Sequence, residues 1–266
     1  MFKVNDIPVK STIFPDGTSQ MWKLPDGLFD GAYTKIVWNF EAEREIMDLF
    51  SLVSLIPNPR TKHTTLFMPY LPYARQDKEI TNNNTFNLRV FARMINSLEF
   101  NRVAATDVHN PDLTKQLINN FVNIHVENHQ VDLISRIKPD YLVFPDAGAR
   151  DRYKYLDGTL IPPLIFEKYR HQGSGVITEH NIINVPIEGL PHAFSGTRFL
   201  VIDDLCDGGA TFISIAKTIK KWCPDPDLFL YVTHGVFSKG LTPLTDVGYK
   251  VYTTNSLIKN VEGFPV

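Results

Sequence analysis

Cysteine is scarce in this sequence, with only Cys206 and Cys223 among 266 residues. Two cysteines cannot build the disulfide framework typical of small secreted proteins, and neither stands in a spacing typical of metal ligands. An excess of charge of one sign is also lacking, because 27 Lys and Arg residues face 29 Asp and Glu residues. A general nucleic-acid-binding protein would normally be clearly basic, so the sequence does not favour a nucleic-acid partner.

Long hydrophobic runs are absent as well. No run approaches the roughly 18 apolar residues of a membrane span, and the N-terminus has no basic segment followed by an apolar core, so we expect no signal peptide. These absences favour a protein of the reducing cytoplasm without a membrane partner. Hydrophobic residues make up 43% of the chain and aromatic residues 12%, which is ample for the core of one large domain or two small ones.

Short apolar runs alternate with helical patterns along the chain. Strands are expected over 33–40, 64–68, 103–106, 141–144, 164–166, 199–202, 228–233 and 250–253, and helices over 41–56, 86–98 and 212–222. In the helix over 86–98, Val90, Phe91, Met94 and Ile95 are expected to point inward. This alternation predicts an α/β fold with mostly parallel sheets covered by helices. Pro139 is a reasonable junction between an N-terminal domain, 1–138, and a C-terminal domain, 139–266.

The most informative stretch covers residues 199–211. Its first four residues predict a short buried strand that ends before Asp203 and Asp204. The loop that follows contains Gly208 and Gly209 and leads into a helical pattern, and such a loop at a helix N-terminus can bind an anion. Two adjacent carboxylates would repel that anion and suit sugar hydroxyls or a metal instead. The stretch therefore predicts a ribose-phosphate site, with an ordinary strand–turn–helix as the alternative interpretation.

The same stretch resembles the phosphoribosyl pyrophosphate (PRPP) signature of type I phosphoribosyltransferases and PRPP synthetases. That signature has apolar residues, two acids, two variable residues, Asp, then Thr or Ser, two small residues and Thr. Further segments resemble PRPP synthetases in particular and occur in the family's order: 14–17, 69–78 (PYLPYARQDK), 107–109, 145–148, Lys168 with Arg170, and 233–236 (THGV). The resemblance implies two type I phosphoribosyltransferase-like domains, each a mostly parallel sheet covered by helices, in a homo-oligomer.

The resemblance also implies which residues bind ATP and the metal. ATP would be held by Arg75, Gln76, Asp77 and His109, and its adenine would be approached by Phe14 and Asp16 of a neighbouring subunit. His109 and Asp146 would help to bind Mg²⁺. Without the resemblance, a plain turn, a solvated loop and a structural histidine are the alternative interpretations of these residues.

The remaining roles concern the acceptor and the transferred group. Lys168 and Arg170 would be catalytic, neutralising charge on the transferring diphosphoryl group; otherwise they are an exposed basic strand end. Ribose phosphate would be bound by Asp203, Asp204, Asp207, Gly208, Gly209, Ala210 and Thr211. The implied reaction is attack of the anomeric hydroxyl of ribose 5-phosphate on the β-phosphorus of ATP, which gives PRPP and AMP. No residue stands out as a general base.

The chain departs from the family pattern in three respects. It is shorter, and the first strand–helix unit is expected to be missing. Thr18 stands where the family has Glu, and Gly208 stands where the family has Thr or Ser, so a hydroxyl donor to the 5-phosphate is lost. The more open loop admits an alternative acceptor, ADP-ribose, which some phage-encoded relatives convert to ADP-ribose 1-pyrophosphate for NAD⁺ salvage. A second alternative is a catalytically silent regulatory subunit.

Overall fold

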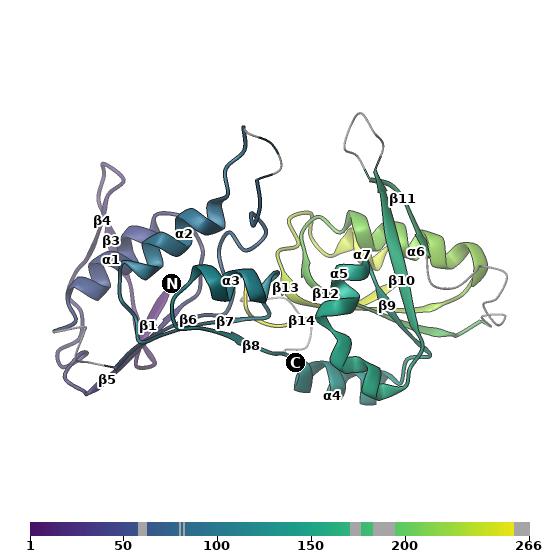
Figure 1. Ribbon diagram of the computed structural model, residues 1–266, viewed down its shortest axis with the longest axis horizontal. Coiled ribbons are helices and arrows are strands. Elements are labelled where there is room, and N and C mark those ends of the chain that lie inside the picture. The colour runs from purple at the N-terminus through teal and green to yellow at the C-terminus, as the bar shows by residue number, and fades with distance from the viewer. Residues whose placement is uncertain (58–62, 80, 82, 171–176, 183–194, 258–266) are drawn as a thin grey trace. The chain divides into compact units, whose positions relative to one another are not determined.

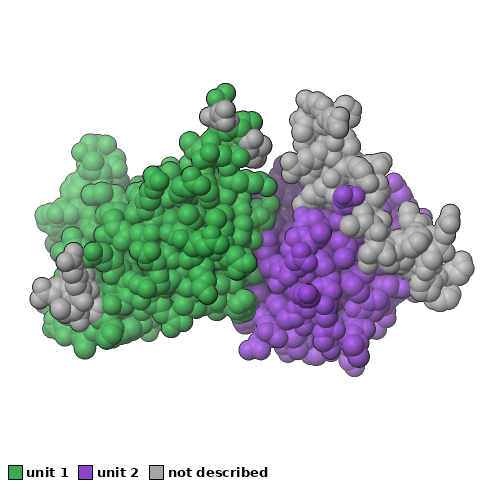
Figure 2. All heavy atoms as spheres, viewed as in Figure 1, with its two compact units in different colours: residues 1–125 green, residues 126–266 purple. Residues whose placement is uncertain are grey.

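A computed structural model describes residues 1–57, 63–79, 81, 83–170, 177–182 and 195–257 (Figure 1). The chain divides into two compact units, residues 1–125 and 126–266 (Figure 2). Helix α4 (Glu127–Ile137) therefore belongs to the second unit, where Leu133, Ile134 and Ile137 join the core. The sequence predicts the junction at Pro139, after this helix, and the division into domains 1–138 and 139–266 stays a prediction.

The sheet of the first unit runs in the order β2-β1-β5-β6-β7-β8. Four neighbouring strands are parallel: β5 (Tyr33–Trp38), β6 (His63–Met68), β7 (Arg102–Thr106) and β8 (Phe121–Ile124). Antiparallel to β5 lies β1 (Phe2–Val4), which pairs with β2 (Ile7–Val9). The separate hairpin of β3 (Ser11–Ile13) and β4 (Ser19–Met21) completes the strands.

Three helices join these strands: α1 (Glu45–Ser54), α2 (Asn87–Asn96) and α3 (Pro111–Leu117). Trp38 of β5, fully buried, packs with Phe91 of α2 at 6.1 Å between ring centroids. Phe91 and Ile95 point inward as predicted, but the prediction for Val90 is wrong, because this side chain is 52% exposed. Helix α2 thus buries a narrower stripe than its apolar residues suggest.

The sheet of the second unit runs in the order β11-β10-β9-β12-β13-β14. Five strands are parallel: β9 (Tyr141–Phe144), β10 (Pro163–Arg170), β12 (Arg198–Cys206), β13 (Asp227–Gly235) and β14 (Tyr249–Thr253). The edge strand β11 (Ile177–Ile182) is antiparallel to β10. Both units thus contain mostly parallel sheets with helices, which confirms the predicted fold class.

Central strand β12 shows why both faces of this sheet are covered. Successive side chains of a strand point to opposite faces, and the whole first half of β12 is apolar. Phe199 and Val201 pack with α6 (Ala210–Trp222) on one face, while Leu200 and Ile202 pack with α4 on the other. Helix α5 (Ala147–Arg152) and the 3₁₀ helix η1 (Lys154–Thr159) also contribute to the core on the α4 face. Helix α7 (Thr242–Thr245) contributes to the core on the α6 face.

Two predicted strand limits need correction. Strand β12 does not end before Asp203 but continues through Cys206, because it stays paired with β13 as far as the partners Cys206 and Gly235. Strand β10 continues through Arg170, because it pairs with β11, a strand that the sequence analysis did not identify. Among the described residues no helix is long and apolar enough to cross a membrane.

Candidate functional site

The glycine loop lies between β12 and α6, as its sequence indicates. Gly209 is the residue that precedes α6, and its φ angle of 77° lies in the left-handed region that favours glycine. A Cβ atom at Gly209 would lie 3.0 Å from Cδ2 of Leu244, so space as well as backbone conformation requires glycine here. The first backbone N–H groups of a helix have no partner within the helix. The loop over 207–211 therefore lies at the positive end of the α6 dipole, where an anion can bind.

Asp203 and Asp204 are adjacent residues within β12. Arg152, the last residue of α5, places its Nη1 atom 2.9 Å from Oδ1 of Asp204 and 3.6 Å from Oδ1 of Asp203. The side chains of Arg152 and Asp203 are each 13% exposed, and that of Asp204 is 3% exposed. A cation between two carboxylates reduces the repulsion between them, so both can lie near the anion-binding loop. The sequence analysis did not predict this arrangement.

Burial and the neighbouring Asp204 raise the pKa of Asp203 well above its usual value, against a lowering by the Arg152 guanidinium. Desolvation disfavours the charged form of a carboxyl group. A sugar hydroxyl that donates to Asp203 would favour the charged form again. The carboxyl pair thus has the chemistry of a hydroxyl-binding site whose charge state depends on its ligand.

The predicted ATP loop, residues 69–78, leaves the end of β6 in the first unit. Leu71 and Ala74 are buried in the core and anchor the loop, while Arg75 and Gln76 are exposed. The hydroxyl of Tyr73 donates to Oε1 of Glu43 at 2.8 Å. The fixed backbone around Arg75 and Gln76 presents their side chains at the carboxyl end of a parallel strand, where ligands bind in such sheets.

Asn110 connects this loop to the segment that carries His109. Its amide Nδ2 donates to Oδ2 of Asp77 at 3.2 Å, and its Oδ1 accepts from the backbone N–H of Leu113 at the start of α3. One side chain thus caps a helix and holds the ATP loop. The structure brings Asp77 together with the residue next to His109, and sequence reasoning gave Asn110 no role.

The turn between β3 and β4 carries Phe14 and Asp16. Oδ1 of Asp16 accepts from the hydroxyl of Thr18 at 2.7 Å and from the backbone N–H of Thr18 at 3.0 Å. The Thr18 hydroxyl lowers the pKa of Asp16, with a further lowering by the backbone bond. Phe14 is 37% exposed. The predicted turn is confirmed, whereas contact of Phe14 and Asp16 with adenine stays a prediction.

The other predicted residues occupy the second unit. Lys168 and Arg170 lie in β10, where they are register partners of His180 and Ile177, and their side chains lie outside what the structure describes. Asp146 is half-buried and precedes α5, and its Oδ1 accepts from the backbone N–H of Ala149 at 2.9 Å. Their catalytic and metal-binding roles stay predictions.

No group of three or more His, Cys, Asp or Glu side chains in the described residues is arranged to hold a metal ion. Mg²⁺ is typically bound by one or two carboxylates together with substrate phosphates and water. The carboxylate of Asp146, at the end of β9, fits this kind of site as a single oxygen ligand.

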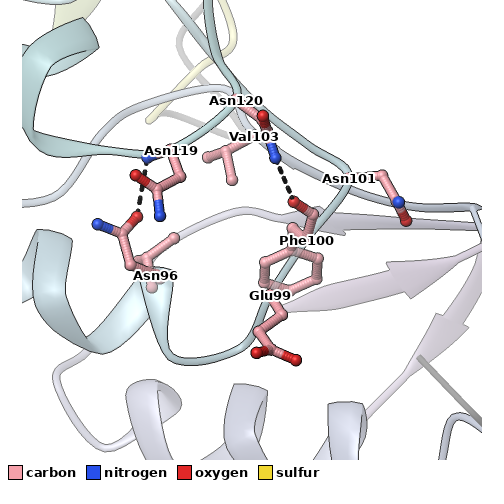
Figure 3. Close-up of a pocket in the computed structure, with 8 residues that line it drawn as sticks. Asn96, Glu99, Phe100, Asn101, Val103, Asn119 and Asn120 are labelled. Atoms are coloured by element: carbon pink, nitrogen blue, oxygen red, sulfur yellow. Dashed lines mark hydrogen bonds between the residues drawn. The ribbon is translucent and has the colours of Figure 1, made fainter. Parts of the chain in front are cut away.

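A pocket of about 400 Å³ in the first unit is not part of this site. Four asparagines, Asn96, Asn101, Asn119 and Asn120, line it (Figure 3). They hold the chain together there, since Asn96 accepts from the backbone of Asn119 at 2.9 Å and Asn120 donates to the carbonyl of Phe100 at 3.1 Å. The pocket lies at the amino ends of β7 and β8, opposite the strand ends where the predicted loops lie.

Sequence reasoning missed Arg152 and Asn110 for different reasons. Arg152 lies six residues after Asp146 at the end of a short helix, and only the fold places it against β12. Asn110 directly precedes Pro111, an order typical of a helix start. That signal could have identified the cap but not the contact with Asp77.

The sequence is similar to known proteins over most of its length. Residues 34–98 match the model of the N-terminal domain of ribose phosphate pyrophosphokinase. The ribose-phosphate pyrophosphokinase of Thermoplasma volcanium is 25% identical over 228 residues, 85% of this chain and 75% of the relative. That of Mycoplasmopsis pulmonis is 24% identical over 260 residues, 94% of this chain and 76% of the relative.

A solved structure shows the same fold. The phosphoribosylpyrophosphate synthetase of Mycobacterium smegmatis superposes with a TM-score of 0.75 at 19% identity, covering 97% of this chain and 84% of that one. The match to the family model includes the loop over 69–78, and the matched relatives extend across both units. The resemblance seen in the sequence is therefore confirmed: the chain is similar in sequence to ribose-phosphate pyrophosphokinases and shares the fold of a phosphoribosylpyrophosphate synthetase.

Proposed function

We propose that this protein transfers the β,γ-diphosphoryl group of ATP to the anomeric hydroxyl of ribose 5-phosphate, giving PRPP and AMP. The observation that carries the proposal is the joint presence of the glycine loop at the start of α6 and the carboxyl pair Asp203 and Asp204 in the preceding strand. The names of the relatives support it, since they are ribose-phosphate pyrophosphokinases.

The residues of the second unit would bind the acceptor. Backbone N–H groups of residues 207–211 bind the 5-phosphate, with the α6 dipole adding about half a positive charge. Asp203 and Asp204 accept hydrogen bonds from ribose hydroxyls, with Arg152 holding Asp204 in place. This arrangement holds the phosphate and the ring hydroxyls of the sugar and leaves the anomeric hydroxyl unbound.

The residues of the first unit would bind the donor. Arg75 suits a bidentate contact with an ATP phosphate, and Asp77 is held by Asn110. Phosphoryl transfer depends mainly on positioning and on neutralising charge, which is the role proposed for Lys168 and Arg170. Mg²⁺, when bound by Asp146 and His109, would supply further charge neutralisation at the ATP phosphates. Phe14 and Asp16 would contact adenine across a subunit interface of a homo-oligomer.

The relatives reported above give no support to ADP-ribose as the acceptor or to a role in NAD⁺ salvage. Their names likewise point to active enzymes and not to a silent regulatory subunit. Both alternatives therefore serve as outcomes of the test that follows.

The test measures AMP release from Mg-ATP with ribose 5-phosphate and with ADP-ribose in parallel, with products identified by mass. PRPP and AMP in equal amounts are expected with ribose 5-phosphate. A variant Asp204→Ala, purified in the same way, controls for contaminating kinases and should lose the activity. Turnover of ADP-ribose alone, or no AMP release with either acceptor, would contradict the proposal.

A further inference from the structure

The space beside Gly208 is filled by Lys239, which follows β13. A Cβ atom built on Gly208 would lie 3.4 Å from both Cδ and Cε of Lys239 and 3.7 Å from its Cγ. The aliphatic stem of the lysine thus lies over the glycine, in contact distance of the position that the family's Thr or Ser side chain would occupy. The side chain of Lys239 is otherwise exposed.

The segment that carries Lys239 is fastened to the glycine loop at three points. The backbone N–H groups of Val236 and Phe237 both donate to the carbonyl of Cys206, at 2.9 and 3.2 Å. Farther along, Leu244 of α7 lies against Gly209, 3.0 Å from where a Cβ atom would be. Contacts on both sides of Lys239 therefore fix where its stem begins.

A close packing of Phe237 explains why this segment turns sharply. A Cβ atom on Gly235 would lie 2.2 Å from the Phe237 ring, so the ring needs glycine beneath it. Phe237 itself has a φ angle of 45°, and the N–H of Gly240 donates to its carbonyl at 2.8 Å. The turn that results directs the lysine back over the loop.

We propose that Lys239 is a phosphate-binding residue of this chain, which supplies to the acceptor's 5-phosphate the donor that Gly208 lacks. An ammonium group offers three N–H donors and a full positive charge, and bonds in which a partner is charged are about twice as strong as neutral ones. Glycine at 208 leaves room for the lysine stem, so the two residues act as a pair. The proposal rests on the proposed function, because it concerns the acceptor of that reaction.

The test compares the KM values of Lys239→Met, Lys239→Arg and wild type in the AMP-release assay. Lys239→Met keeps the length of the stem and removes the charge, so the KM for ribose 5-phosphate should rise about tenfold while the KM for ATP stays within twofold. Lys239→Arg keeps the charge, so its KM for ribose 5-phosphate should stay close to that of wild type. Lys221→Met, an exposed lysine in the last turn of α6, is the matched control and should change neither value.

A second variant tests the pairing with Gly208. Adding Gly208→Ser to Lys239→Met restores a hydroxyl donor. The double variant should have a KM for ribose 5-phosphate at least threefold lower than that of Lys239→Met alone. In the wild-type background the same serine would lie against the lysine stem and, because Lys239 already supplies a donor, should bring no such gain. A Lys239→Met variant whose KM for ribose 5-phosphate stays within twofold of wild type would overturn the proposal.

Direct binding separates this inference from the proposed function. Calorimetric titration of wild type and Lys239→Met with ribose 5-phosphate, and with ribose lacking the phosphate, needs no turnover. A tenfold loss of affinity confined to the phosphorylated sugar supports the role of Lys239 even if no AMP is released. Equal affinities of the two proteins for ribose 5-phosphate would overturn that role, even in an enzyme that makes PRPP.

Discussion

The guanidinium of Arg152 lies 2.9 Å from the carboxylate of Asp204, in the interior of the second unit. Helix α5 supplies the cation and strand β12 the anion, so the pair ties a helix to the central strand beside the anion-binding loop. Breaking a buried ion pair by removing one partner is costly, because the other charge stays buried.

We therefore expect Arg152→Met to lower the free energy of unfolding by about 3 kcal/mol, since the pair is buried apart from the 13% exposure of the arginine side chain. Denaturant titration measures the change. Arg136→Met serves as control, because its pair with Asp132 is exposed at 48% and 61% and should cost at most about 0.5 kcal/mol. Equal costs for the two variants would argue against a buried pair.

The raised pKa of Asp203 predicts a pH dependence of stability. A carboxyl group whose pKa is raised by folding binds its proton more tightly in the folded state, so its contribution to stability falls as the pH rises above 3.8. Asp203→Asn removes this titration. The free energy of unfolding of the variant minus that of wild type should increase between about pH 4 and pH 8, as measured by denaturant titration.

Because wild type is subtracted at each pH, the titrating groups that do not interact with Asp203 cancel in this comparison, and the difference reports the coupled pair of Asp203 and Asp204. A difference that stays constant or falls with pH would show that the Asp203 carboxyl group is not disfavoured in its charged form by folding.

A substitution of Gly209 tests the geometry of the loop. Gly209→Ala meets a left-handed backbone and a contact of 3.0 Å with Leu244, so we expect a loss of stability greater than the roughly 1–2 kcal/mol of the backbone term alone. The KM for ribose 5-phosphate should rise as the N–H groups shift. Thermal unfolding and AMP release measure the two effects.

The matched control is Gly196→Ala, which has a φ angle of 82° and no atom within 4 Å of the added Cβ. It should lose only the stability that the left-handed backbone costs an alanine, and the KM for ribose 5-phosphate should stay unchanged. If both glycines behave alike, the packing of Leu244 on the loop has no measurable effect.

Two substitutions of Asn110 separate its two contacts. Asn110→Ser keeps an oxygen that can cap α3 but cannot reach Asp77 with an amide donor, so stability should stay within about 0.5 kcal/mol while the KM for ATP rises roughly three- to tenfold. Asn110→Ala loses both contacts, so its free energy of unfolding should in addition fall by about 1 kcal/mol. An unchanged KM for ATP in both variants would show that the position of Asp77 does not depend on Asn110.

The positions of several parallel strands could be predicted from the sequence because their apolar runs form the buried core. Tyr141 to Phe144 illustrates this, since the predicted and observed limits of β9 agree. Strand β12 could not be delimited in the same way. Its last residues include Asp203 and Asp204, and polar residues after an apolar run are typical of a loop. Only pairing with β13 extends the strand through them.

Within the candidate site, residues in a local motif could be found and their distant partners could not. The residues of the glycine loop are contiguous in the sequence, so the sequence alone predicts a turn between a strand and a helix. Arg152 reaches the carboxyl pair, and Lys239 reaches the loop, from other elements. Their positions depend on how α5 and the segment after β13 pack on the sheet. Such contacts follow from tertiary packing, which periodicity does not encode.

The shared acceptor of Val236 and Phe237, the carbonyl of Cys206, has a kinetic consequence. Both N–H groups must be released before the segment over 236–245 can separate from the end of β12, so we expect the segment and the glycine loop to move together. We expect the acceptor's phosphate to meet an anion site that is already assembled, with an association rate set by diffusion and orientation and with no slow closing phase.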